Sequence, residues 1–118
     1  PEMLAVEGYY TAAEEKLWLT ALAHWRLVLM GMKVQNYEDA KAHYAQLQSD
    51  FTPETPGYPV AALAKRFWDR YLEVGNIVYG CQDMVNAPEA QAVLDFLNSY
   101  GYANPMYTAE ELCPYLTP

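Results

Sequence analysis

Residues 11–33 read TAAEEKLWLTALAHWRLVLMGMK, and the apolar residues of this segment recur at helical spacing. Thr11 followed by Glu14 is a capping-box pattern, which predicts a helix over residues 12–33. At about 100° per residue, the apolar side chains form two stripes. The first stripe comprises Leu17, Trp18, Ala21, Leu22, Trp25, Val28, Leu29 and Met32, and the second comprises Leu19, Ala23, Leu27 and Met30. A helix with two apolar sides belongs at the centre of a bundle or at a subunit interface.

The segment that follows predicts a second, ordinary amphipathic helix. Asn36 with Asp39 three residues later is a helix start signal, which predicts a helix over residues 37–50. Its inward positions are Tyr37, Ala40, Tyr44, Leu47 and Phe51. Residues 52–59 contain three prolines and a glycine, so they predict the longest loop of the chain.

Three further helices follow from similar signals. A proline in the first turn and Gly80 as the stop predict a helix over residues 60–79, with the clearest amphipathic pattern in the chain. A start signal at Asn-Ala-Pro-Glu predicts a helix over residues 87–100. A capping-box pattern over residues 108–111 predicts a short helix that Pro114 ends.

These elements predict an all-α fold, a compact bundle of four main helices plus a short C-terminal helix. The chain has 118 residues, of which 53% are hydrophobic and 19% are charged, as in globular rather than disordered proteins. A chain of this length buries about two thirds of the surface that it exposes when unfolded. We therefore expect a single helical domain over residues 1–118.

One helical pair resembles a tetratricopeptide unit. The resemblance rests on Leu27, on Tyr-Glu-Asp-Ala over residues 37–40, on Tyr44 and on Pro53. Trp25 stands one place away from the aromatic of that motif, and no second copy follows about 34 residues later, whereas a solenoid needs about three units. An unrelated αα-hairpin is therefore the preferred interpretation.

Charge is distributed unevenly along the chain. The net charge is −8, and no lysine or arginine follows Arg70. The acidic residues after this point are Glu73, Asp83, Glu89, Asp95, Glu110 and Glu111. Six of the eleven tyrosines lie in the same half, namely Tyr71, Tyr79, Tyr100, Tyr102, Tyr107 and Tyr115. Acidic groups interspersed with tyrosines predict a surface for a basic or polar protein partner.

The same charge balance argues against nucleic-acid and membrane partners. Seven basic residues at a pI near 4.5 are too few for the clustered lysines and arginines that bind phosphate backbones. Mimicry of a DNA duplex would need a denser negative charge than fifteen partly neutralised acids supply. No segment reaches the roughly 18 consecutive apolar residues of a membrane span.

The sequence contains no motif that indicates catalysis. His24 and His43 are the general-base candidates, and their positions on helix faces favour structural roles. Together with Cys81 and Cys113 they lack the short spacings of zinc sites, so we expect no metal. Acidic pairs such as Glu110 and Glu111 fall in first helical turns, where capping explains them. We expect neither an enzyme nor a cofactor.

Two cysteines alone do not distinguish one disulfide from two free thiols. The preferred interpretation is two unlinked thiols in a reducing compartment, which favours a soluble cytoplasmic protein. The chain begins at Pro1 without a methionine, which suggests the removal of an N-terminal piece.

The leading functional hypothesis is a non-catalytic interaction module, such as an inhibitor, immunity factor, adaptor or assembly chaperone. Its expected partner-binding residues are Tyr9, Tyr10, Tyr100, Tyr102, Tyr107, Glu110 and Glu111. Self-association to a homo-oligomer is expected through Leu19, Ala23, Leu27 and Met30.

The alternative is a bundle that binds a small apolar or aromatic ligand or cofactor between the first and third helices. Trp18, Trp25 and Trp68 would line that site, with Met30, Met32 and Met84 as adaptable walls. Core packing explains the same residues more simply.

Overall fold

The computed structural model describes residues 10–100 and 108–114, and this part of the chain is all-α, without a strand. Five α-helices and one short 3₁₀-helix follow one another. They are α2 (Ala12–Lys33), α3 (Tyr37–Asp50), α4 (Tyr58–Val74), α5 (Ile77–Val85), α6 (Glu89–Tyr100) and the 3₁₀-helix η1 (Ala109–Leu112). The prediction of an all-α bundle with a short helix near the C-terminus is confirmed.

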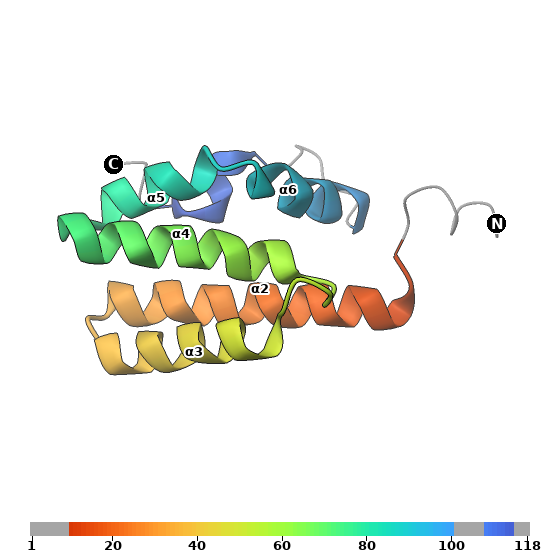
Figure 1. Ribbon diagram of the computed structural model, residues 1–118, viewed down its shortest axis with the longest axis horizontal. Helices are drawn as coiled ribbons and strands as arrows, with labels where there is room; N and C mark the ends of the chain where they lie inside the picture. Colours follow the sequence, from red (N-terminus) through yellow and green to blue (C-terminus); the bar gives the residue numbers. More distant parts are fainter. Residues whose placement is uncertain (1–9, 101–107, 115–118) are drawn as a thin grey trace.

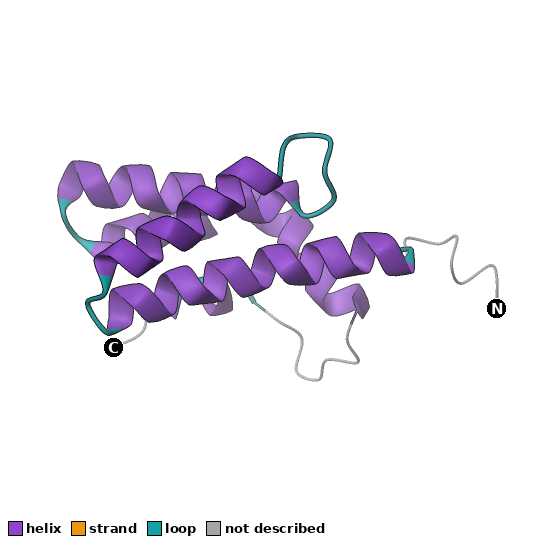
Figure 2. Ribbon diagram, turned by 90° about the horizontal axis from the view of Figure 1, so that it is seen from below, coloured by secondary structure: helices purple, strands orange, loops and turns teal. Residues whose placement is uncertain are grey.

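The helices form layers around α4 (Figure 1). On one side of α4, the antiparallel helices α2 and α3 lie next to each other as an αα-hairpin. On the other side lie α5, α6 and η1. The loop 51–57 lies at one end of the bundle, and the short turns after α2 and α4 lie at the other end (Figure 2).

Local signals explain where α2 and α3 begin. The Thr11 side chain accepts a hydrogen bond from the backbone N–H of Glu14 at 3.1 Å, and the Glu14 carboxylate accepts one from the backbone N–H of Thr11 at 2.9 Å. This reciprocal pair is the predicted capping box. The Asn36 side chain accepts a hydrogen bond from the backbone N–H of Asp39 at 3.2 Å, which confirms the predicted start of α3.

The predicted helix over residues 60–79 is wrong at its C-terminal end. Helix α4 ends at Val74, because Gly75 adopts a left-handed conformation with φ of 77° and donates its N–H to the Tyr71 carbonyl. The next residue, Asn76, caps a new helix by accepting a hydrogen bond from the N–H of Val78 at 2.9 Å. Gly80, which the sequence suggested as a stop, lies inside α5.

This break also changes which apolar side chains are buried. Apolar residues on either side of the break, Leu72, Val74 and Val78, are exposed to 65%, 41% and 38%. The change of helix direction after Gly75 removes the common face that a single straight helix would have presented. The buried face of α4 comprises Val60, Ala61, Leu63, Ala64, Phe67 and Trp68.

Each tryptophan joins a different pair of helices. Trp18 of α2 stacks on Phe96 of α6, with ring centroids 4.8 Å apart. Trp25 of α2 meets Phe67 of α4 edge to face at 5.2 Å. The third, Trp68 of α4, stacks on Tyr44 of α3 at 4.7 Å. Stacked and edge-to-face aromatic pairs add stability beyond the area that they bury, so these contacts position the helices relative to one another.

Candidate interaction surfaces

The structure covers only part of the predicted partner-binding set. Tyr9, Tyr102 and Tyr107 lie outside the described residues. Tyr100 ends α6 and Glu110 lies in η1, and the structure does not describe the side chains of these two residues. The proposal that they bind a partner therefore stays a prediction.

Tyr10 lies at the edge of the core rather than free on the surface. Its ring is half-buried and packs edge to face against Phe96 at 5.2 Å and Trp18 at 5.9 Å. Burial raises the pKa of the Tyr10 phenol, and the nearby carboxylates of Asp95 and Glu14 raise it further. These contacts give Tyr10 a structural role in covering the end of the Trp18–Phe96 stack.

Glu111 also has a structural role. Its carboxylate accepts a hydrogen bond from the backbone N–H of Thr108 at 2.6 Å, which caps the start of η1 as the sequence predicted. A substitution at Glu111 would therefore disturb the C-terminal segment as well as its charge.

The acidic half is partly neutralised by a helix that precedes it. Arg70 of α4 forms an ion pair with Glu73 at 2.7 Å, and Arg66 of α4 forms one with Glu89 of α6 at 3.1 Å. The sequence has no lysine or arginine after Arg70, but folding brings Arg66 next to Glu89. Two of the six acidic residues that follow Arg70, Glu73 and Glu89, are therefore paired with bases of α4.

An acidic and aromatic surface remains on α5. Tyr79 and Asp83 lie one helical turn apart, and both are exposed, with Tyr79 exposed to 45%. Gln82 lies beside them on the same outer side, opposite the buried residues Gly80, Cys81 and Met84. We call Tyr79, Gln82 and Asp83 the α5 surface. The signal for it was present in the sequence, but the predicted continuous helix obscured which side faced outward.

The second stripe predicted on α2 is exposed along the whole helix. Leu19, Leu27 and Met30 are exposed to 37%, 41% and 58%, and Ala23 is exposed between them. We call Leu19, Ala23, Leu27 and Met30 the outer stripe of α2. Its exposure is what self-association would require, but the structure contains one chain, so self-association stays a prediction.

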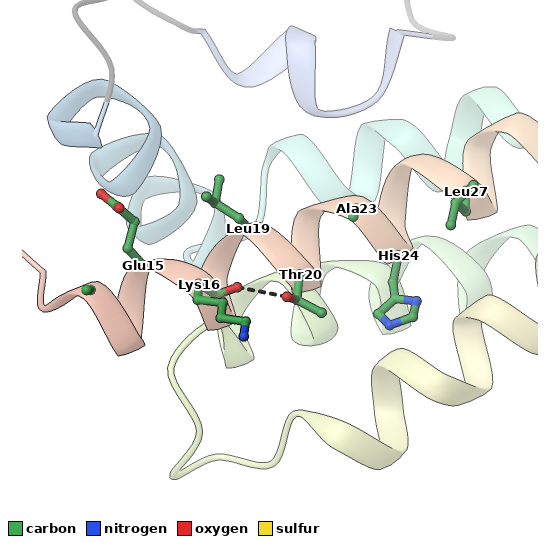
Figure 3. A pocket seen from close by; sticks show the side chains of 8 residues that line it. Glu15, Lys16, Leu19, Thr20, Ala23, His24 and Leu27 are labelled. Atoms are coloured by element: carbon green, nitrogen blue, oxygen red, sulfur yellow. Dashed lines mark hydrogen bonds between the residues drawn. The ribbon is translucent and has the colours of Figure 1, made fainter.

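Two open depressions lie along this helix. The first, about 440 Å³, extends from Ala12 to Leu27 and includes Leu19 and Ala23 (Figure 3). Its rim is polar, because Glu15 and Lys16 extend to either side of the stripe in this view. The second depression, about 310 Å³, is lined by Arg26, Leu29, Met30, Lys33 and Pro114. Both depressions are partly apolar and could receive side chains of a partner.

The two histidines face each other across the α2–α3 hairpin. The ring centroids of His24 and His43 are 5.9 Å apart, and His43 Nε2 lies 3.7 Å from the Asp39 carboxylate. The buried Nδ1 of His24 has no hydrogen-bond partner among the described residues. Within residues 10–100 and 108–114, no group of three metal-ligating side chains is placed to hold a metal ion.

Residues considered for a small-ligand site have packing roles. The three tryptophans contact other aromatic rings, and Met32 and Met84 are buried at 2% and 1% exposure. Met30, by contrast, points outward and is the most exposed member of the outer stripe. The geometry therefore gives no specific observation in favour of a ligand between α2 and α4.

The interpretation of two free thiols is wrong. Cys81 of α5 and Cys113, which follows η1, form a disulfide, with Cα atoms 5.4 Å apart. Their separation of 32 residues hides this proximity, because it arises when η1 packs against α5. The disulfide is reinforced by a buried hydrogen bond from Trp25 Nε1 to the Leu112 carbonyl at 2.7 Å.

Comparison with known proteins identifies no family for this chain. No protein-family model, curated protein or solved structure matches the chain. The resemblance of residues 27–53 to a tetratricopeptide unit thus has no support from a family model, and the αα-hairpin interpretation agrees with the observed α2–α3 pair. Among the described helices, none has the length and apolarity needed to cross a membrane.

Proposed function

We propose that this protein is a non-catalytic interaction module that binds a basic or polar protein partner through acidic and tyrosine side chains of its C-terminal half. The observation that carries the proposal is the α5 surface, where Tyr79 and Asp83 are both exposed and adjacent. A net charge of −8 supports it, because a basic partner would be attracted before contact.

The two side chains would contribute in different ways. A tyrosine supplies a large contact area with few rotatable bonds, so little conformational entropy is lost when it is held at an interface. An exposed carboxylate mainly accelerates encounter with a basic partner. Arg70 is engaged mainly by Glu73, with which it forms an ion pair at 2.7 Å, and it interacts more weakly with the nearby charge of Asp83.

An inhibitor, an immunity factor, an adaptor and an assembly chaperone would all use such a surface. The disulfide favours an oxidising compartment for this protein, because disulfides persist in such compartments and are rare in the cytosol. We therefore place the proposed interaction in an oxidising compartment, in contrast to the cytoplasmic location expected from sequence.

Asp83 offers a sharper test than Glu111, because it has no capping role. The protein would be used to capture its partner from the source organism, and association of the purified partner would be followed at several salt concentrations. We expect Asp83→Lys to slow association and to flatten its salt dependence. Glu54→Lys, at an exposed position of the loop 51–57, makes the same charge change away from α5 and serves as the matched control.

Tyr79→Ser tests the aromatic part of the surface. We expect faster dissociation with little change in the association rate, because the tyrosine contributes contact area and not charge. If association and dissociation are the same for Asp83→Lys, Tyr79→Ser and the native chain, the α5 surface is not the binding site.

A further inference from the structure

Three exposed basic side chains lie on the outer side of α2. Lys16 lies to one side of Leu19 (Figure 3). Helical spacing places Arg26 and Lys33 on the other side of the outer stripe, next to Met30. All three are exposed, and none forms an ion pair with a described residue. Only one acid shares this side of the helix, the half-buried Glu15. The outer side of α2 is therefore apolar along its middle, and its edges carry three basic side chains against one acidic side chain.

The basic residues of α2 differ from those of α4 and from the overall charge of the chain. The basic residues of α4 are all engaged, in the pairs Lys65–Asp69, Arg66–Glu89 and Arg70–Glu73. The whole chain has a net charge of −8. A basic, partly apolar helix face on an acidic protein selects for a partner with the opposite pattern, since complementary charges flank the apolar contact.

We propose that the outer side of α2 binds an acidic amphipathic helix of a partner protein. Apolar side chains of that helix, spaced by three and four residues, would pack on the outer stripe and enter the two depressions. Its flanking carboxylates would meet Lys16 on one edge and Arg26 and Lys33 on the other. At 22 residues, α2 is about 33 Å long, enough to pair with several turns of a partner.

Two other occupants fit the charges less well. A second copy of this chain, docked through the same side, would bring the three basic residues of each α2 close to those of the other. An anionic membrane is a broad plane, and it would bring the acidic body near its own negative charge. A single helix, about 10–12 Å across, would cover the outer stripe and its basic edges without reaching the acidic body of the protein.

A designed peptide tests this directly. The probe is a fluorescently labelled helical peptide of about 20 residues, with leucines along one side and glutamates flanking them. The matched peptide replaces each glutamate by lysine. Fluorescence anisotropy should show binding of the acidic peptide, weaker at high salt, and no binding of the lysine version.

Variants of the protein locate the site. We expect Arg26→Glu together with Lys33→Glu to weaken binding of the acidic peptide roughly tenfold. Leu27→Gln should weaken it through the loss of apolar contact, without unfolding, because Leu27 is exposed to 41%. The control is Lys41→Glu in α3, an exposed and unpaired base away from the outer stripe, which should bind within about twofold of the native chain.

Several results would overturn the proposal. They are no binding of the acidic peptide, equal binding of both peptides, or a loss of affinity in Lys41→Glu that matches the loss in the double variant Arg26→Glu, Lys33→Glu. A concentration-dependent dimer that Leu27→Gln abolishes would assign the outer stripe to a second copy. Binding to vesicles of anionic phospholipid, lost in Arg26→Glu, would assign it to a membrane. The proposal shares no residue with the α5 surface, so Asp83→Lys should leave peptide binding unchanged.

Discussion

Two helix pairs of this bundle approach each other closely, and each close contact depends on a glycine. A Cβ atom on Gly31 of α2 would come within 2.9 Å of the Cβ and backbone N of Ala40 in α3. A Cβ atom on Gly80 of α5 would come within 2.8 Å of the Phe67 carbonyl oxygen in α4. In both places the lack of a side chain lets two helices approach backbone to backbone.

The two contacts differ in what surrounds them. The α2–α3 contact joins helices that are neighbours in sequence, across the short turn 34–36. Next to the α4–α5 contact, Cys81 binds covalently to a segment 32 residues away. That segment buries few residues, among them Leu112 and Cys113. Neighbouring helices can be held by packing and a turn, whereas a short distant segment needs a stronger link because its loop closure costs entropy.

The largest effect on stability is expected from Phe67→Ala, since Phe67 packs against helices on both sides of α4. Its ring is fully buried, meets Trp25 of α2 and lies against Gly80 of α5. We expect the free energy of unfolding, measured by chemical denaturation, to fall by about 3–5 kcal/mol. Phe67→Leu keeps much of the volume and should lose clearly less. Equal losses in the two variants would contradict this expectation and would mean that the specific contacts of the aromatic ring, and not the volume that it fills, stabilise this position.

Removal of the disulfide should cause the second largest loss of stability. For a loop of this length, replacing both Cys81 and Cys113 by alanine should lower the free energy of unfolding by about 3–4 kcal/mol. The native chain in a reducing agent should approach the stability of this double variant. If the variant were as stable as the oxidised native chain, packing alone would hold η1 in place.

Smaller effects should come from the glycines themselves. In an open helix, Gly→Ala stabilises by about 0.5–1 kcal/mol, but Gly31→Ala and Gly80→Ala should each destabilise by about 1–3 kcal/mol. The sign of the change in the free energy of unfolding therefore distinguishes a glycine at a close helix contact from a glycine in an open helix.

Combining these variants sharpens the comparison. Without the disulfide, α5 can shift away from α4, so Gly80→Ala should cost less in the Cys81→Ala, Cys113→Ala background. Gly31→Ala should cost the same in both backgrounds, because distant sites add independently. A Gly80→Ala cost that is independent of the disulfide would contradict the idea that the covalent link holds α5 in place.

The smallest effect concerns alkaline pH. Burial raises the pKa of Tyr44, the negative charge of Asp69 raises it further, and Tyr10 behaves similarly. A pKa that is higher in the folded chain favours the neutral phenol there, so this stability is complete below about pH 10 and is lost as the pH rises through the raised pKa. Denaturation series from neutral to alkaline pH should show a decline that is weaker in Tyr44→Phe. An identical decline in the variant would exclude Tyr44 as a cause.

Prediction from sequence succeeded where the signal was local. The capping box at Thr11 and Glu14, the Asn36 cap and the two stripes of α2 each depend on residues within a few turns of one another. Prediction failed at Gly75, because the continuing apolar pattern through Val78 masked a left-handed residue that ends α4. It also failed for the cysteines, which come together only when α5 and η1 pack.

The candidate surfaces also divide into features that local sequence patterns define and features that depend on folding. The outer stripe of α2 was visible in the sequence because helical spacing alone defines it. Its basic character follows only from the folded structure, because it depends on which lysines and arginines form no ion pair with another described residue. The apparent acidic half depended on sequence order, and the ion pair between Arg66 and Glu89 shows that folding redistributes this charge.

The amino-acid sequence by itself determined the helical class, the bounds of α2 and α3, and the two apolar stripes of α2. These properties follow from propensity, capping and periodicity, which act over one or two helical turns. Only the tertiary structure decided the disulfide, the division of the third predicted helix into α4 and α5, and which charges stay unpaired. These depend on contacts between residues far apart in the chain, whose proximity exists only after the helices have packed.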